Sequence, residues 1–145
     1  MKDTKCPYCM QDENPSLYQK FGYKLCDLKV STLILFKEQS HKGRCIVAYK
    51  GHVGEITELN DEELFAFEKD VQVVAKAMHA AFNPTKINYG SYSDTLNHLH
   101  VHLCPKYKDD DFEFGGTFAM NPNRVNPAED ELKAIGAEIV KNIKY

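Results

Sequence analysis

Three histidines alternate with apolar residues in the segment His98-Leu99-His100-Val101-His102-Leu103. Successive side chains of a β-strand point to opposite faces, so this spacing predicts a row of three imidazoles on one face. Core-facing strand positions favour Val, Ile and Leu, so packing does not explain the row. Imidazoles placed in this way suit metal ligation, nucleophilic attack or proton donation. The row holds half of the 6 histidines in the chain, which argues against chance histidines on a solvated face, and we interpret the segment as a functional strand.

Cys6 and Cys9 have the spacing of one half of a zinc-binding knuckle. The alternatives are a redox pair or two free surface thiols. A redox pair usually opens a helix after a strand, whereas this pair precedes a polar stretch that contains a proline. A structural zinc ion needs two further ligands, and the candidates are His41, His52, His79 and one member of the histidine row. We expect His79 to be solvated, because it lies off the apolar face of a predicted helix.

The bulk composition is that of an ordinary globular protein. The 145 residues fit one domain, with 43% hydrophobic and 27% charged residues. A net charge of -3 excludes a broad duplex-binding surface but remains compatible with single nucleotides. Apolar runs such as residues 33–36 are too short to span a membrane, and the first residues do not resemble a signal peptide, so we expect a cytoplasmic protein. The other cysteines, Cys26, Cys45 and Cys104, are expected to be small buried apolar residues.

Hydrophobic periodicity predicts an α+β fold. Asn60 and Glu63 form a capping-box pattern, followed by an amphipathic helix to about Phe82. Asn126-Pro127 has the signature of the start of a last helix, which runs to about Ile143. Between these elements we expect a long polar loop over residues 106–126. The predicted strands are 23–28, 30–36, 44–49, 86–90 and 98–105, the last two paired across residues 91–94.

The row resembles the His-φ-His-φ-His-φ-φ signature of the histidine triad (HIT) superfamily of nucleotidyl hydrolases and transferases, in which φ is apolar. Segment 43–52 resembles the Gly-His-φ-φ-φ-φ-Pro-Lys-x-His segment of that family, and Asn88-Tyr89-Gly90 resembles its Asn-x-Gly strand. The likeness spans roughly residues 6–107. It implies a HIT-like fold with an antiparallel sheet, one long helix and a C-terminal helix. The zinc knuckle would lie near residues 6–9, the catalytic core at about 17–107, and a C-terminal loop and helix at 108–145.

The resemblance also implies an activity. His100 would attack the α-phosphorus of a dinucleoside polyphosphate or a nucleoside phosphoramidate and carry the nucleotidyl group. A neutral imidazole is nucleophilic at pH 7, which suits this role. His102 would touch the phosphate or the leaving-group oxygen, Asn88 would donate a hydrogen bond to the α-phosphate, and Thr95 occupies the place of a hydroxyl near the bridging atom.

Zinc-bearing relatives imply a metal site. Carried over, their ligands are Cys6, Cys9, His52 and His98, two sulfurs and two nitrogens that leave no open position and so make the ion structural. His41 is the alternative to His52. Relatives commonly form homodimers, and we expect one here.

The sequence departs from the family pattern at three places. Arg44 stands where the family usually has histidine, and it is either a source of positive charge for a phosphate or a solvated edge residue. Phe36-Lys37 replaces the acid that commonly holds the ribose hydroxyls, and Glu38 is displaced from that register. Asp94 replaces the glutamine that usually precedes the triad.

Two rival interpretations follow. The departures at Phe36 and Asp94 favour a nucleotide-binding or sensing module with little turnover. Alternatively, the whole histidine row ligates one ion. Same-face strand positions are about 6.5–7 Å apart, which strains a single tetrahedral site and disfavours this second rival.

Overall fold

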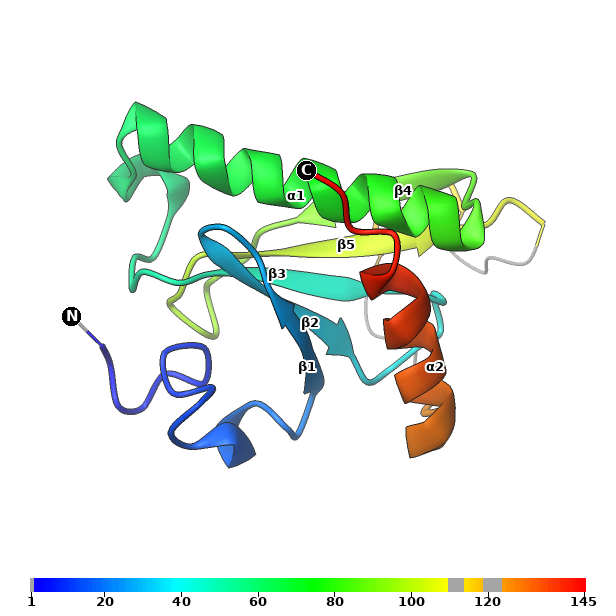
Figure 1. The fold of residues 1–145 in the computed structure, drawn as a ribbon, viewed down its shortest axis with the longest axis horizontal. Helices are drawn as coiled ribbons and strands as arrows, with labels where there is room; N and C mark the ends of the chain where they lie inside the picture. Colours follow the sequence, from blue (N-terminus) through cyan, green and yellow to red (C-terminus); the bar gives the residue numbers. More distant parts are fainter. Residues whose placement is uncertain (1, 110–113, 119–123) are drawn as a thin grey trace.

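The core of the fold is a five-stranded antiparallel sheet. The structure is a computed structural model that describes residues 2–109, 114–118 and 124–145. The strand order is β1-β2-β3-β5-β4, and two helices complete the fold (Figure 1). The predicted α+β class is therefore confirmed. The strands are β1 Gly22–Asp27, β2 Ser31–Phe36, β3 Cys45–Tyr49, β4 Lys86–Gly90 and β5 His100–Lys106; the helices are α1 Asp61–Phe82 and α2 Glu129–Val140, with short 3₁₀ turns at Pro15–Leu17 and Ile56–Glu58.

Helix α1 begins at the predicted capping box. The Asn60 side chain accepts a hydrogen bond from the Glu63 amide at 2.9 Å, and the Glu63 carboxylate accepts one from the Asn60 amide at 3.0 Å. These two bonds satisfy amides that the first helical turn leaves without a partner. The helix ends where Asn83 adopts a left-handed conformation before Pro84. Among the described helices, none combines the length and apolarity that crossing a bilayer requires.

The two faces of the sheet are covered by different parts of the chain. One face packs on α1 through apolar residues of alternate strand positions, such as Leu33, Val47 and Leu103. The opposite face contributes Ile34 and Ile46 to a second cluster with the N-terminal segment. Figure 1 shows α1 along one side of the strands and the N-terminal segment on the other. The period of two along each strand thus separates a helix-packed face from the face that carries His100 and His102.

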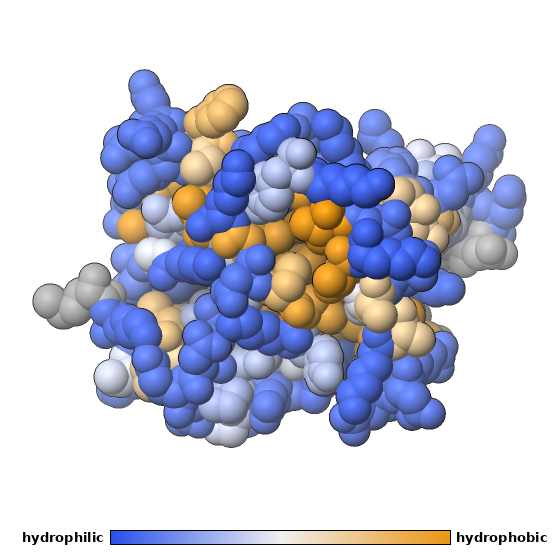
Figure 2. Space-filling model, in the orientation of Figure 1, coloured by the Kyte–Doolittle hydropathy of each residue, from blue (hydrophilic) through white to orange (hydrophobic). Residues whose placement is uncertain are grey.

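The molecular surface in this view separates into an apolar region and a polar surround. In Figure 2, hydrophobic side chains gather near the centre of the view, over the strands beside α1 and α2, and hydrophilic residues surround them. Partly buried residues of β1, among them Leu25 and Cys26, pack against the main core.

Three predictions about local structure were wrong in detail. Strand β5 begins at His100, so the first imidazole of the row precedes the strand, where the Leu99 amide bonds to the Val53 carbonyl. Helix α2 begins after Ala128, not at Asn126-Pro127, and it ends at Val140 rather than about Ile143. Its first turn holds three acidic residues, which stabilise the positive end of the helix dipole in place of a capping side chain.

The remaining predictions agree with the structure or fall partly outside the described residues. Strands β4 and β5 pair antiparallel across the 91–94 connection as predicted. Strand β5 continues to Lys106, the first residue of the predicted loop. Residues 110–113 and 119–123 of that loop lie outside the described residues.

Candidate functional site: four metal donors beside a histidine-lined cavity

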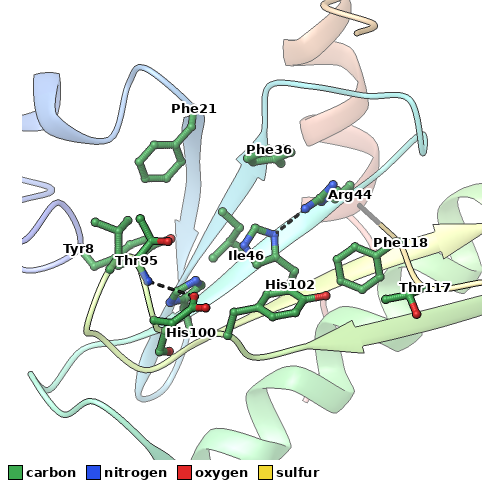
Figure 3. A pocket seen from close by; sticks show the side chains of 14 residues that line it. Tyr8, Phe21, Phe36, Arg44, Ile46, Thr95, His100, His102, Thr117 and Phe118 are labelled. Atoms are coloured by element: carbon green, nitrogen blue, oxygen red, sulfur yellow. Dashed lines mark hydrogen bonds between the residues drawn. The ribbon is translucent and has the colours of Figure 1, made fainter. Parts of the chain in front are cut away.

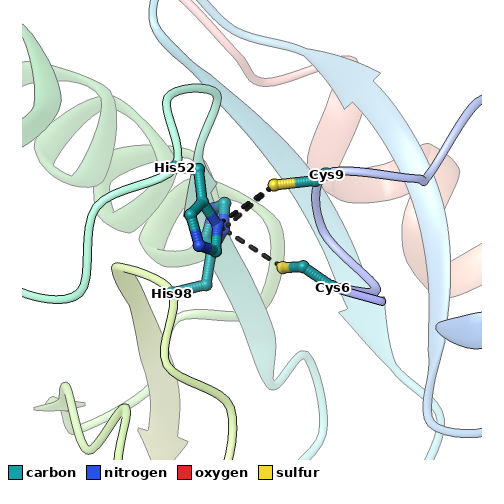
Figure 4. Close-up of side chains that lie close together, drawn as sticks. All are labelled: Cys6, Cys9, His52 and His98. Atoms are coloured by element: carbon teal, nitrogen blue, oxygen red, sulfur yellow. Dashed lines mark hydrogen bonds between the residues drawn. The ribbon is translucent and has the colours of Figure 1, made fainter. Parts of the chain in front are cut away.

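Four potential metal donors meet at the edge of the second cluster. Cys6, Cys9, His52 and His98 each offer one ligand atom, and all four atoms lie within 4.8 Å of one another. Cys6 Sγ is 3.3 Å from His98 Nδ1, Cys9 Sγ is 3.2 Å from His52 Nδ1, and the two Nδ1 atoms are 3.3 Å apart. Figure 4 shows the two thiols of the N-terminal segment facing the two imidazoles. We call these residues the donor group.

The chemistry of the donor group fits a tetrahedral zinc ion. Zn–S bonds of about 2.3 Å and Zn–N bonds of about 2.1 Å would set the donors about 3.4–3.8 Å apart, close to the distances observed. His98 Nε2 donates to the Tyr49 carbonyl at 2.7 Å, so the lone pair of the neutral ring lies on Nδ1, toward the thiols. Burial lowers the pKa of His98 to about 4, which keeps the ring neutral. His41 is buried in the β2–β3 turn and lies outside this group.

A cavity of about 640 Å³ opens next to the donor group, on the same sheet face. Figure 3 shows Tyr8, Phe21 and Thr95 toward one end and Arg44, Thr117 and Phe118 toward the other, with His100 and His102 between them. The wall is largely aromatic and apolar, with a few polar groups that converge on its floor, an arrangement typical of small-molecule sites. The lining residues are Tyr8, Phe21, Phe36, Arg44, Ile46, Tyr92, Ser93, Asp94, Thr95, Leu96, His100, His102, Thr117 and Phe118.

His100 is held in one orientation and one tautomer. Its Nδ1 donates to the carbonyl of His98 at 2.6 Å, so the lone pair of the neutral ring lies on Nε2. Burial lowers the pKa of His100 below its ordinary value, and only 5% of the residue is exposed. The Tyr8 ring lies 4.9 Å from the His100 ring and 5.2 Å from the His98 ring, between centroids. His100 therefore combines a neutral ring with an available nitrogen.

Arg44 and His102 form a contact pair at the other end of the cavity. The guanidinium lies 3.3 Å from His102 Nδ1 and between two aromatic rings, 4.4 Å from the centroid of Phe36 and 5.0 Å from that of Phe118. Arg44 is 4% exposed, so the interpretation as a solvated edge residue was wrong. Burial, and then the charge of Arg44, lowers the pKa of His102 to about 3. The rings of His100 and His102 are 5.4 Å apart.

The other candidate residues take different positions. Thr95 and Asp94 line the cavity from the β4–β5 connection, and the Asp94 carboxylate accepts a hydrogen bond from the Thr95 amide at 3.0 Å. Asn88 and Gly90 lie opposite Cys104 and His102 in the ladder, so Asn88 shares the face of the histidines. Asn88 is not among the described residues that line the cavity.

Glu38, the acid displaced from the family register, is buried and serves the backbone of the β2–β3 turn. It accepts hydrogen bonds from the amides of Ser40 and Val125 at 3.1 and 3.0 Å. Glu38 therefore stabilises the backbone of this region, and it is not among the described residues that line the cavity.

Sequence reasoning missed the aromatic walls. Tyr8 lies inside the Cys6–Cys9 knuckle, and its place between two cysteines with metal-ligand spacing is the one signal that could have found it. Phe118 comes from a loop with no periodic pattern. The structure admits its ring because Gly90 has no side chain: a Cβ there would lie 2.7 Å from Phe118 Cζ.

A family model of the HIT domain matches residues 24–109. The matched range includes His100 and His102 on the cavity floor and most of the sheet. The chain therefore belongs to the HIT domain family.

Individual relatives agree with this membership. An adenosine 5'-monophosphoramidase of Schizosaccharomyces pombe is 29% identical over 122 residues, which cover 83% of this chain and 88% of that protein. A histidine triad protein structure from Sinorhizobium meliloti has a TM-score of 0.80 at 20% identity, covering 88% of this chain and 93% of the other. A zinc-bound histidine triad family protein from Mycobacterium smegmatis has a TM-score of 0.59 at 18% identity, covering 81% and 84%.

Proposed function

We propose that this protein cleaves a dinucleoside polyphosphate or a nucleoside phosphoramidate at the α-phosphate through a covalent nucleotidyl-histidine. Membership of the HIT domain family supports a nucleotide hydrolase or transferase in general. The relative named as an adenosine 5'-monophosphoramidase supports the phosphoramidate class of substrate. Both substrate classes would leave the same nucleotidyl group on the enzyme.

The observation that carries the proposal is the orientation of His100. Because its Nδ1 proton is committed to the His98 carbonyl, its Nε2 lone pair is free to attack. In the first step Nε2 forms a P–N bond, while the bond from phosphorus to the leaving group breaks and the leaving group takes a proton from solvent. In the second step water attacks the phosphorus and loses a proton to solvent, the P–N bond breaks and restores the neutral imidazole, and a nucleoside monophosphate leaves.

The other polar residues of this face would bind the phosphate. His102 contacts a phosphoryl or leaving-group oxygen, and Thr95 offers a hydroxyl from the rim of the cavity. Asn88 binds the α-phosphate if the ligand extends along β4. Arg44 supplies positive charge locally, which matters because the chain has a net charge of -3 and no global field that would attract a phosphate.

We propose a structural zinc ion in the donor group. Four protein donors leave no open coordination position, so such an ion would supply cross-linking rather than Lewis-acid chemistry. His98 is both a donor and, through its backbone carbonyl, the acceptor that orients His100. The donor group thus helps to hold the proposed nucleophile in place without touching the substrate.

A second candidate function is a nucleotide-binding or sensing module with little turnover. Phe36 offers no carboxylate for a ribose, and Asp94 puts a carboxylate at the cavity where a phosphate would bind. Like charges at this position weaken phosphate binding and slow attack on it. Product formation separates the two functions.

Several broader expectations stay predictions. We propose that residues 1–145 form one domain and that two copies form a homodimer, since β4 leaves one edge of the sheet unpaired within the described chain. A cytoplasmic location and the absence of a duplex nucleic-acid partner remain predictions of the sequence.

The deciding experiment uses two substrates, diadenosine tetraphosphate and adenosine 5'-phosphoramidate. We expect the wild-type protein to release AMP from at least one of them. With a radiolabelled adenosine moiety, acid-labile label should be found on the protein in a rapid quench. His100→Gln should lower kcat by about 10⁴-fold or more, because loss of a nucleophile removes the covalent path.

The matched control is His79→Gln, which replaces an exposed histidine of α1. We expect it to retain wild-type turnover. Tight nucleotide binding without product from the wild type would favour the sensing module, and full activity of His100→Gln would refute the mechanism.

A further inference from the structure

We infer that Arg44 is a positioning residue that acts through His102. Its guanidinium fixes His102 as a neutral imidazole with the proton on Nε2, which makes His102 a hydrogen-bond donor to a phosphoryl or leaving-group oxygen. The tautomer follows from contacts within the chain alone. Its use toward an oxygen of the substrate rests on the proposed function.

The direction of the contact follows from the chemistry of arginine. A guanidinium has only donors, so across the 3.3 Å contact Arg44 donates and His102 Nδ1 accepts. An accepting Nδ1 carries no proton, and a neutral imidazole then carries its proton on Nε2. His102 lines the cavity, so Nε2 is the ring nitrogen left to meet a ligand.

Two aromatic rings prevent Arg44 from turning away. Phe36 and Phe118 stack on the guanidinium, and the residue is almost fully buried. The His102 ring also packs edge-on against Phe36, with centroids 5.6 Å apart. This packing restricts both partners, so the contact is a fixed part of the site rather than one of several arrangements that a surface arginine samples.

The charge of Arg44 also selects against the cationic form of His102. Among the described residues, the titratable or charged groups that face this imidazole are Arg44 immediately before β3, His100 from β5 and Tyr92 from the β4–β5 connection. None of them is an acid, and the pKa of His102 is lowered to about 3. His102 therefore stabilises negative charge by donating a hydrogen bond, and it does not give up a proton as an imidazolium would.

Arg44 polarises the donor as well as orienting it. A positive charge beside Nδ1 withdraws electron density from the ring, which makes the Nε2 proton a stronger hydrogen-bond donor. The arrangement is the reverse of a carboxylate–histidine pair, in which the negative charge makes the imidazole more basic. Its effect should increase as negative charge develops on the phosphoryl oxygens, so Arg44 should affect kcat more than ground-state binding.

The test is a long-range ¹H–¹⁵N NMR spectrum of the ¹⁵N-labelled protein at pH 7, with the His102 signals assigned through His102→Gln. We expect Nε2 protonated and Nδ1 bare in the wild type. Arg44→Met keeps an apolar stem but loses the donor, so it should give a tautomer mixture and protonation of His102 at higher pH. Arg44→Lys restores a charged donor and should shift the signals back toward those of the wild type.

The kinetic measurement uses whichever substrate the wild type cleaves. Arg44→Met should lower kcat by about tenfold or more, and this loss should exceed the accompanying rise in the Kd for AMP. The matched control is Lys42→Met, which removes another cation two residues away; Lys42 is exposed and lies over Phe82. We expect this control to leave both the spectrum and kcat unchanged.

A wild-type His102 that carries its proton on Nδ1 or is doubly protonated at pH 7 would overturn the inference, and so would an unchanged tautomer in a folded Arg44→Met. The wild-type spectrum is decisive even if the arginine variants do not fold. If the wild type cleaves neither substrate, the proposed function fails, whereas the spectrum still decides whether Arg44 sets the tautomer.

Discussion

His98 belongs to the donor group and His100 lines the cavity. The two residues are only two positions apart in the chain, yet their imidazoles leave different ring nitrogens available for chemistry. His98 donates its Nε2 proton to the Tyr49 carbonyl and turns Nδ1 toward the thiols. His100 donates its Nδ1 proton to the His98 carbonyl and has Nε2 available. The difference shows that the backbone acceptor within reach of each ring, rather than the residue type, decides which nitrogen can do chemistry.

The two regions are joined by Tyr8. Its ring packs on both imidazoles, and it belongs to the segment whose two cysteines complete the donor group. A change in the donor group should therefore reach the cavity through Tyr8 and the His98 carbonyl. A change in the cavity should leave the donor group intact, because no donor atom depends on it.

The largest effect is expected from Cys9→Ser, which tests whether a change in the donor group reaches the cavity. The wild-type protein should contain about one zinc ion per chain, and the variant should lose it. The free energy of unfolding should fall by several kcal/mol, since metal binding and folding are linked at a structural site, and turnover should fall with it. Elemental analysis and thermal unfolding measure both effects.

The matched control is Cys26→Ser, which changes a half-buried cysteine of β1 outside the donor group. It should retain the metal. No zinc in the wild type, or equal zinc in Cys9→Ser, would contradict the assignment of the donor group.

A smaller effect is expected from acid. The unfolded chain protonates His102 near pH 6.5, whereas burial and Arg44 hold its pKa near 3 in the folded protein. Between these values the unfolded state binds more protons, so stability falls as the pH falls below about 6.5. This residue alone should account for about 2 kcal/mol at pH 5.

Chemical denaturation of the wild type and His102→Gln at pH 7 and pH 5 measures this effect. The variant should lose less stability on acidification than the wild type, while His79→Gln should behave as the wild type does. Parallel losses in all three proteins would mean that His102 is as easily protonated in the folded chain as in the unfolded one.

The smallest expected effect concerns Tyr8, which joins the donor group and the cavity. Changing this residue distinguishes the packing of its ring from metal ligation. Tyr8→Leu removes the ring but no donor atom, so zinc content should stay at the wild-type value. Tyr8 lines the cavity, where its ring can pack on a bound ligand; an aromatic ring contact contributes about 0.5–1.5 kcal/mol, so the Kd for AMP should rise about two- to tenfold. Tyr8→Phe retains the ring and should restore most of the affinity. Loss of zinc from Tyr8→Leu would show that the bridge supports the donor group instead.

The sequence predicts local structure well where a short pattern carries the information. The capping box at Asn60 and the pairing of residues 86–90 with the histidine strand depend on nearby residues, and both predictions are confirmed. His98 departs from its predicted strand because the Leu99 amide bonds to the carbonyl of Val53, a residue far away in the sequence. Periodicity holds no information about such a partner.

The candidate site follows the same rule. Motif spacing indicated the cysteine pair and the histidine row, and the family resemblance then selected His52 and His98 for the donor group and His100 and His102 for the cavity floor. It did not predict that Arg44 is buried, because Phe36 and Phe118 reach it from a neighbouring strand and a distant loop. Aromatic walls assembled from irregular segments have no local signature, and they are the part of the site that required the structure.

The donor group also closes long loops of the chain. Cys6 and His98 are separated by 92 residues, and Cys9 and His52 by 43. The chain loses much conformational entropy when residues so far apart in the sequence come into contact. Such contacts therefore form slowly. We therefore expect the sheet and α1 to assemble first and the segment around Tyr8 to dock afterwards, so that the wall of the cavity beside His100 is completed late in folding.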